Sequence, residues 1–181
     1  MERLVVGNVM PDFEFETPFE SGCTLEKTLQ RVDGKTALVF LRYYGCTLCQ
    51  YDIHRFAEQQ ELIKATGGQM LVVLQSDPAH LAEQLKPEDL PFDIICDPQQ
   101  TLYKQFAIKP AASKMGLADP KTVMKLGKAK AEGYVHGDFE GEELQLPAVF
   151  VLKQDRTITQ AHYGKSAGDV PDAEKLADWL K

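Results

Sequence analysis

Two short apolar runs, residues 36–42 (TALVFLR) and 70–75 (MLVVLQ), enclose a longer segment with helical periodicity. Both runs are rich in Val and Leu, which is typical of strands buried on both faces of a sheet. The segment between them, from Cys46 to about Thr66, places its apolar residues on one helical face, and Gly67-Gly68 is typical of a helix end. Because a strand–helix–strand crossover joins parallel strands, this unit predicts an α/β fold.

The rest of the chain continues the same alternation. Asp and Pro stand together at 77–78 and at 97–98, and each pair is typical of a helix N-terminus. Residues 148–153 (AVFVLK) and 157–163 (TITQAHY) predict a hairpin around a short turn, and residues 172–181 predict a closing helix with Leu176, Trp179 and Leu180 on its buried side.

The 181 residues fit one domain, so we expect a single domain over 1–181 with a charged insertion at about 107–146. The insertion holds six lysines, followed by four acidic residues between 138 and 143. Two interpretations stay open. It is a solvated loop whose charges largely cancel, or it is a lid or docking arm, since long loops in compact domains often carry function.

Charge and hydropathy exclude several classes of function. The formal net charge of −7 argues against nucleic-acid binding, which needs a basic face. The longest apolar runs have five or six residues, far short of the roughly 20 that span a membrane. The N-terminal residues lack the apolar core of a secretory signal, so we expect a cytoplasmic protein.

Cys46 and Cys49 stand three residues apart, directly after the first predicted strand and at the start of the predicted helix. A helix N-terminus stabilises a thiolate, and cysteines in such motifs have lowered pKa values. Their expected Cβ separation of about 5–6 Å is close to the roughly 4 Å of a disulfide. The position therefore predicts a redox-active dithiol. We interpret Cys23 and Cys96 as structural thiols.

Free Cys is commonly a core residue, so a pair of buried packing cysteines is one alternative to a redox pair. A zinc site is the other alternative for a Cys-x-x-Cys pair. It needs about four ligands, and this chain has no second Cys-x-x-Cys and only scattered histidines. We expect neither a metal nor a cofactor.

Several segments carry a resemblance to a known family. The opening GNVMPDFEFET, the segment FDIICDPQQTLYKQFAI, and the later LQLPAVFVL and HYGKSAGDVPD resemble the peroxiredoxin family (AhpC/TSA), in the branch with a Cys-x-x-Cys active site. The resemblance implies a thioredoxin-like fold, with a central mixed β-sheet, helices on both faces and a peroxiredoxin-type N-terminal extension. It also implies thiol-dependent redox activity.

The peroxiredoxin motif Pro-x-x-x-Thr-x-x-Cys aligns with Arg42, Cys46 and Cys49 in place of its Pro, Thr and Cys. The family's catalytic Arg is replaced near Pro147, which instead matches the cis proline of thioredoxins. Arg42 is a candidate to stabilise a thiolate electrostatically.

Three residues next to the cysteines complete the candidate site. Thr47 lies inside the motif, and Tyr43 and Tyr44 precede it. The two tyrosines are candidates for an aromatic wall, although strand alternation places one of them in the core. We expect Tyr44 and Thr47 to support the cysteine pair.

Three functions follow. In the first, the protein reduces hydroperoxides: Cys49 attacks the peroxide and Cys46 resolves the sulfenic acid. In the second, Cys46 attacks a substrate disulfide and Cys49 resolves it. The third is a redox-sensing module without turnover.

Either enzyme would need a thiol reductant such as thioredoxin or glutathione. Members of the family often form a homodimer, and no pattern in this sequence indicates a pairing face.

Overall fold

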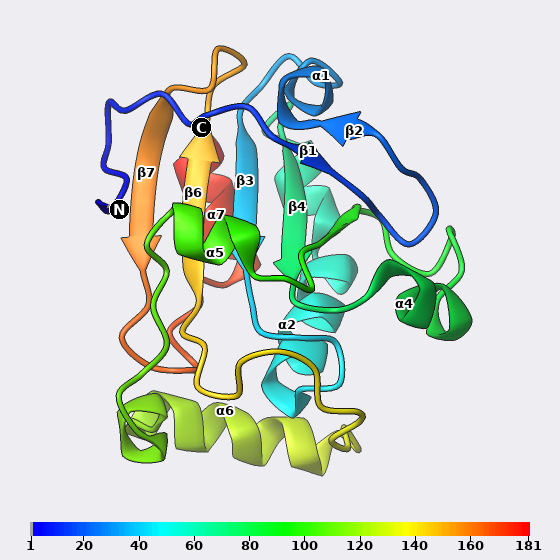
Figure 1. The fold of residues 1–181 in the computed structure, drawn as a ribbon, viewed down its shortest axis with the longest axis vertical. Coiled ribbons are helices and arrows are strands. Elements are labelled where there is room, and N and C mark those ends of the chain that lie inside the picture. Colours follow the sequence, from blue (N-terminus) through cyan, green and yellow to red (C-terminus); the bar gives the residue numbers. More distant parts are fainter. Residues whose placement is uncertain (1) are drawn as a thin grey trace.

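The computed structural model describes residues 2–181. The elements follow one another as shown in Figure 1: β1 (Glu14–Phe15), β2 (Cys23–Thr24), α1 (Leu25–Leu29), β3 (Thr36–Phe40), α2 (Thr47–Glu58), α3 (Gln60–Lys64), β4 (Gln69–Leu74), α4 (Pro78–Gln84), β5 (Ile94–Cys96), α5 (Thr101–Gln105), the 3-10 helix η1 (Lys114–Leu117), α6 (Pro120–Ala131), β6 (Ala148–Leu152), β7 (Ile158–Tyr163) and α7 (Ala173–Leu180).

A five-stranded mixed sheet forms the centre, in the order β5-β4-β3-β6-β7. β3 pairs in parallel with β4, as the strand–helix–strand unit predicts, and β4 pairs in parallel with β5. β6 runs antiparallel to β3, and β7 runs antiparallel to β6. The predicted hairpin is therefore confirmed, and it joins the parallel unit through the central strand β3.

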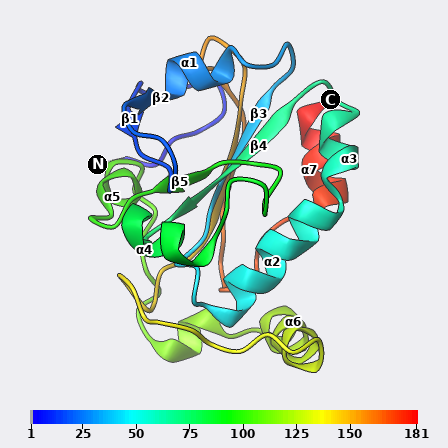
Figure 2. The same ribbon diagram turned by 90° about the vertical axis from the view of Figure 1, so that its right-hand side faces the viewer.

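Alternating side chains of the sheet serve two separate cores. Val39 belongs to the cluster under α2, α3 and α7, and its neighbour Phe40 belongs to the cluster under α1 and α5. Figure 2 shows the sheet edge-on between these two layers. Every residue of β3 is buried, because both faces of the central strand are covered.

Local capping accounts for two of the predicted helix starts. Asp77 caps α4 by accepting hydrogen bonds from the backbone N–H groups of Ala79 and His80, with Pro78 in the first turn. Asp172 caps α7 in the same way, through the N–H of Lys175. Trp179 of α7 is only partly buried, although we expected it on the buried side.

The helix expected from Cys46 to about Thr66 is divided in two at Gln59, whose φ of −104° and ψ of 18° leave the helical region. α2 packs against α6, whereas α3 packs against α7. Phe56 and Ile63 nevertheless face the same core cluster, so the apolar pattern continues across the break and hides it in the sequence.

The segment 107–146 is more than a solvated loop. It contains η1 and α6, and α6 lies across the end of the sheet beside α2 (Figure 1). The chain then returns toward β6 along the same end (Figure 1). Among residues 2–181, no helix is long and apolar enough to cross a membrane.

Candidate active site

The cysteine pair lies at the start of α2, after the short connection from β3. Cys46 is the N-cap residue of α2, and its sulfur accepts a hydrogen bond from the backbone N–H of Cys49 at 3.4 Å. Cys49 follows in the first turn of the helix. Both cysteines are free thiols in this structure, and they are buried, with 1% and 4% of their surface exposed. The predicted placement at a helix N-terminus is therefore what the structure shows.

Arg42 sits directly against the pair. Its Nη2 lies 3.0 Å from the Cys46 sulfur, and its backbone N–H donates to the Cys49 sulfur at 3.4 Å. A guanidinium at this distance forms a charge-assisted hydrogen bond with a thiolate. Arg42 thus supplies a fixed positive charge at the position where the family motif has its Pro.

The surroundings of the two thiols shift their pKa values in opposite directions. A hydrogen bond from the Cys49 side chain, together with the charge of Arg42, lowers the pKa of Cys46 to about 6 in spite of burial. Burial, followed by the interaction with Cys46, raises the pKa of Cys49 well above its usual range. At neutral pH the structure therefore favours a thiolate on Cys46 and a neutral thiol on Cys49.

Residues from the insertion hold this arrangement in place. The backbone carbonyl of Glu143 accepts a hydrogen bond from Arg42 Nη1 at 2.5 Å. The carboxylate of Glu143 accepts another from the Tyr43 hydroxyl at 2.5 Å, and His136 Nε2 lies 3.1 Å from the same hydroxyl. Neither Glu143 nor His136 stands out in the sequence, where the length of the 107–146 insertion is the signal that points to this segment.

The residues around Glu143 cover the site. The N–H of Gly137 donates to the carbonyl of Gly45 at 2.8 Å, so the two backbones touch. A Cβ atom at Gly45 would lie 2.3 Å from the carbonyl oxygen of Asp138. The N–H of Glu142 donates to Gln75 Oε1 at 2.6 Å, and Glu140 accepts from the N–H of Asp77 at 3.0 Å. We call residues 137–145 the covering segment.

Tyr43 is the tyrosine that lies in the core, but strand alternation is not the reason, because β3 ends at Phe40 and both tyrosines pack against the same core cluster. Tyr43 is fully buried, and burial together with its hydrogen bond to Glu143 raises the pKa of its hydroxyl. Tyr44 is partly buried against the α2 side of the core. Its backbone N–H donates to Ser76 Oγ at 3.0 Å. Thr47 is buried in the first turn of α2.

Pro147 lies beside the cysteines, but the expectation of a cis bond is wrong. The peptide bonds of the described residues are all trans. Pro147 precedes the first paired residue of β6, Ala148, so its missing N–H removes no bond from the sheet ladder. Its carbonyl accepts a hydrogen bond from Gly164, whose backbone packs against the proline ring. A trans proline therefore fits the strand entry without weakening the sheet.

The space next to the thiols is minimal. A cavity of about 10 Å³ is lined by Arg42, Cys46, Cys49 and Pro147 among others. A single water molecule needs roughly that much. With Cys46 1% exposed, a cavity of this size has no room for a substrate larger than water.

The remaining cysteines fit the structural interpretation. Cys23 and Cys96 are buried, and burial raises the pKa of Cys96 to about 12. Within residues 2–181, no three His, Cys, Asp or Glu side chains are grouped so that they could hold a metal ion.

Comparisons with known proteins agree with this architecture. The prostamide/prostaglandin F synthase of Danio rerio is 27% identical over 147 residues, which cover 79% of this chain and 72% of that protein. Peroxidoxin BcpB from Mycobacterium tuberculosis superposes with a TM-score of 0.65 at 15% identity, over 96% of this chain and 91% of the other. A putative thiol:disulfide interchange protein DsbE from Chlorobium tepidum gives a TM-score of 0.60 at 16% identity, over 98% and 96%.

These structural likenesses establish a thioredoxin-like fold, with its mixed central sheet and helices on both faces. The family model of the AhpC/TSA family matches residues 6–161, which is most of the chain. The chain therefore belongs to the AhpC/TSA family and is a thiol oxidoreductase.

Proposed function

We propose that this protein reduces hydroperoxides with Cys46 as the attacking thiolate and Cys49 as the resolving thiol. The contact of 3.0 Å between Arg42 Nη2 and the Cys46 sulfur carries this proposal. It supports a thiolate on Cys46, and the same guanidinium can stabilise the negative charge that develops on the leaving oxygen. The roles of the two cysteines are thus the reverse of those implied by the peroxiredoxin motif.

The reaction balances with the residues present and an external reductant. The Cys46 thiolate attacks one peroxide oxygen, the O–O bond breaks, and the departing oxygen takes up a proton as an alcohol or water. Cys46 becomes a sulfenic acid. The Cys49 thiol then attacks the Cys46 sulfur, and water leaves as the disulfide forms. A dithiol such as thioredoxin, or two glutathione molecules, returns the pair to thiols.

Burial of the pair favours a small substrate. A protein disulfide must bring a sulfur atom into line with the attacking thiolate, and Cys46 is 1% exposed beneath the covering segment. A hydroperoxide needs far less room. Movement of residues 137–145 would admit it, and the hydrogen bonds of Glu143 to Arg42 and Tyr43 are the contacts that this movement breaks.

Disulfide reduction is the second candidate, because one observation favours it. A low pKa on the first cysteine and a high pKa on the second is the order in which a Cys-x-x-Cys pair attacks and resolves a disulfide. A redox-sensing module would use the same chemistry but would show no turnover with any reductase.

Single-turnover kinetics of Cys46→Ser and Cys49→Ser test the assignment. We expect the reduced Cys49→Ser protein to consume one equivalent of hydrogen peroxide and to form a sulfenic acid on Cys46, trapped by dimedone and located by mass spectrometry. Cys46→Ser should react no faster than a free thiol. A sulfenic acid on Cys49 in the Cys46→Ser protein would refute the assignment.

Assays of the wild-type protein distinguish between a peroxide and a disulfide as the substrate. Peroxide consumption no faster than that of a free thiol would refute peroxide reduction, and insulin-disulfide reduction would then test the second candidate. Oxidation of the pair without turnover in either assay would favour the sensing module.

A further inference from the structure

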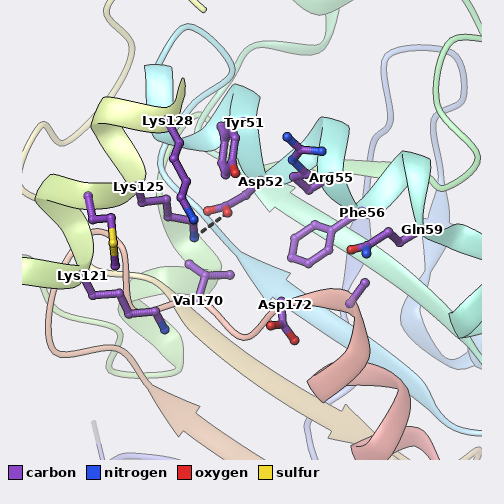
Figure 3. A pocket seen from close by; sticks show the side chains of 12 residues that line it. Tyr51, Asp52, Arg55, Phe56, Gln59, Lys121, Lys125, Lys128, Val170 and Asp172 are labelled. Carbon is purple, nitrogen blue, oxygen red and sulfur yellow. Dashed lines mark ion pairs between the residues drawn. The ribbon is translucent and has the colours of Figure 1, made fainter. Parts of the chain in front are cut away.

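A second cavity lies between α2, α6 and the start of α7. It has a volume of about 290 Å³, close to the lower end of the roughly 300–1,000 Å³ range of small-molecule sites. Figure 3 shows the side chains that line it, from α2, α6 and the start of α7. The cysteines do not line it, and Asp52 is the residue it shares with the small cavity beside them.

One wall of this cavity is cationic. Lys121, Lys125 and Lys128 stand at helical spacing on α6, and their side chains extend from that helix into the cavity (Figure 3). Like charges at this spacing repel one another on an isolated helix. Lys125 is neutralised by the buried Asp52, with 2.5 Å between Nζ and Oδ1.

The other charges around the cavity leave two lysines without a partner. Arg55 pairs with Glu58 and Glu132, outside the cavity wall. Asp172 accepts the N-cap hydrogen bond of α7. Among the described residues, neither Lys121 nor Lys128 forms an ion pair, and these two ammonium groups are left facing the space.

Opposite the lysines, the wall formed by α2 is mixed, with Tyr51, Asp52, Arg55 and Gln59 beside Phe56. The base is apolar and consists of the buried side chains of Phe56, Val170 and Ala173. Met124 lies at the rim with 61% of its surface exposed. A cavity with an apolar base and unpaired cations at one side matches a ligand with one anionic head and an apolar chain.

We propose that this cavity binds an amphipathic monocarboxylate with a chain of medium length. Its carboxylate lies between the ammonium groups of Lys121 and Lys128, and its chain lies against Tyr51 and Met124 above the buried base. Exposed ion pairs alone are weak, so the apolar contact is needed for binding and the lysines select for the charged head. This gives the α6 part of the insertion a ligand-binding role that is independent of the dithiol reaction.

Isothermal titration calorimetry with decanoate tests the proposal on the full chain. The variant Lys121→Gln/Lys128→Gln removes the two unpaired charges and leaves the Lys125–Asp52 pair intact. The matched control Lys109→Gln/Lys130→Gln removes the same net charge from exposed positions outside the cavity, one of them on α6. Decanol serves as the uncharged ligand of the same chain length.

We expect saturable binding of decanoate to the wild type, about tenfold weaker binding to Lys121→Gln/Lys128→Gln, and unchanged binding to the control. Decanol should bind the wild type more weakly than decanoate does. Met124→Glu, which places a carboxylate at the rim, should also weaken decanoate binding. The melting temperatures of the variants show whether each is folded.

Absence of saturable decanoate binding to the wild type would overturn the proposal. Equal loss of affinity in the control would reduce the effect to net charge and would overturn it as well. Equal affinity for decanol and decanoate would remove the role of Lys121 and Lys128. The result for this cavity and the peroxide assay are separate measurements, so either can fail without the other.

Discussion

Replacing Arg42 with Met tests the electrostatic origin of the reactive thiolate. Met keeps much of the side-chain length and removes the charge that lies 3.0 Å from the Cys46 sulfur. A hydrogen bond to a charged group contributes about 1.5–3 kcal/mol. One pKa unit corresponds to about 1.36 kcal/mol, so the substitution should raise the pKa of Cys46 from about 6 to about 7–8.

The consequence at neutral pH is large. At a pKa of about 6, roughly nine-tenths of Cys46 is thiolate at pH 7, whereas at a pKa of about 8 only about one-tenth is. The alkylation rate of Cys46 should therefore fall several-fold at pH 7. It should converge with the wild-type rate above about pH 9, where both proteins carry the thiolate.

The assay is the rate of iodoacetamide alkylation against pH, with mass spectrometry to locate the modified cysteine. Arg55→Met is the matched control, because Arg55 lies on α2, the helix that carries the cysteines, and pairs with Glu58 at the surface. An unchanged alkylation midpoint in Arg42→Met would show that the guanidinium does not stabilise the thiolate. Equal changes in both variants would point to overall charge instead.

Two predictions concern stability. Gly45→Ala should reduce the free energy of unfolding by about 1–3 kcal/mol in urea titrations, because its Cβ would lie 2.3 Å from the Asp138 carbonyl oxygen of the covering segment. Gly127→Ala in α6 is the control: nothing lies within 4 Å of its Cβ, so it should stabilise the protein by up to about 1 kcal/mol, and equal effects of both variants would contradict the close approach. Burial raises the pKa of Asp52 to about 6, above its unfolded value of about 3.9. The folded state then binds the extra proton between these values, so stability should fall by at most about 3 kcal/mol as the pH rises from about 4 to about 6. Asp52→Asn should flatten this slope, whereas the exposed Asp33→Asn should leave it unchanged, and a wild-type slope that survives in Asp52→Asn would assign it to other groups.

The sequence alone was sufficient for features that neighbouring residues control. The apolar runs of β3 and β4 require burial on two faces, and the helical spacing between them requires a crossover, so their parallel pairing followed. Asp77 and Asp172 cap helices through N–H groups two or three residues away, which makes those starts readable from short patterns. Cys46 and Cys49 at the start of α2 were predicted for the same reason.

Tertiary structure decided which cysteine carries the negative charge. Arg42 is four residues from Cys46, and its sequence position alone left open where the guanidinium points. Its orientation depends on the carbonyl of Glu143, which lies 101 residues away in the chain. The order of the two thiol pKa values follows from that contact, from burial and from the hydrogen bond between the sulfurs.

The insertion and Pro147 are two further features whose structure could not be predicted from the sequence. Nothing in the spacing of residues 107–146 indicates that α6 packs on α2 or that residues 137–145 cover the thiols, because both depend on contacts across long loops. The bond before Pro147 is trans, and it leaves the sheet ladder intact because the proline lies just outside it, a position that depends on how β6 pairs with β3. The sequence by itself therefore determined the strand–helix–strand crossover, the hairpin and the place of the two cysteines, since each depends on periodicity and on neighbouring residues, whereas the mixed sheet was implied by the family resemblance. Only the tertiary structure decided the contacts of Arg42 with the two thiols, the covering segment and the lysine-lined cavity, because these arise where distant segments meet.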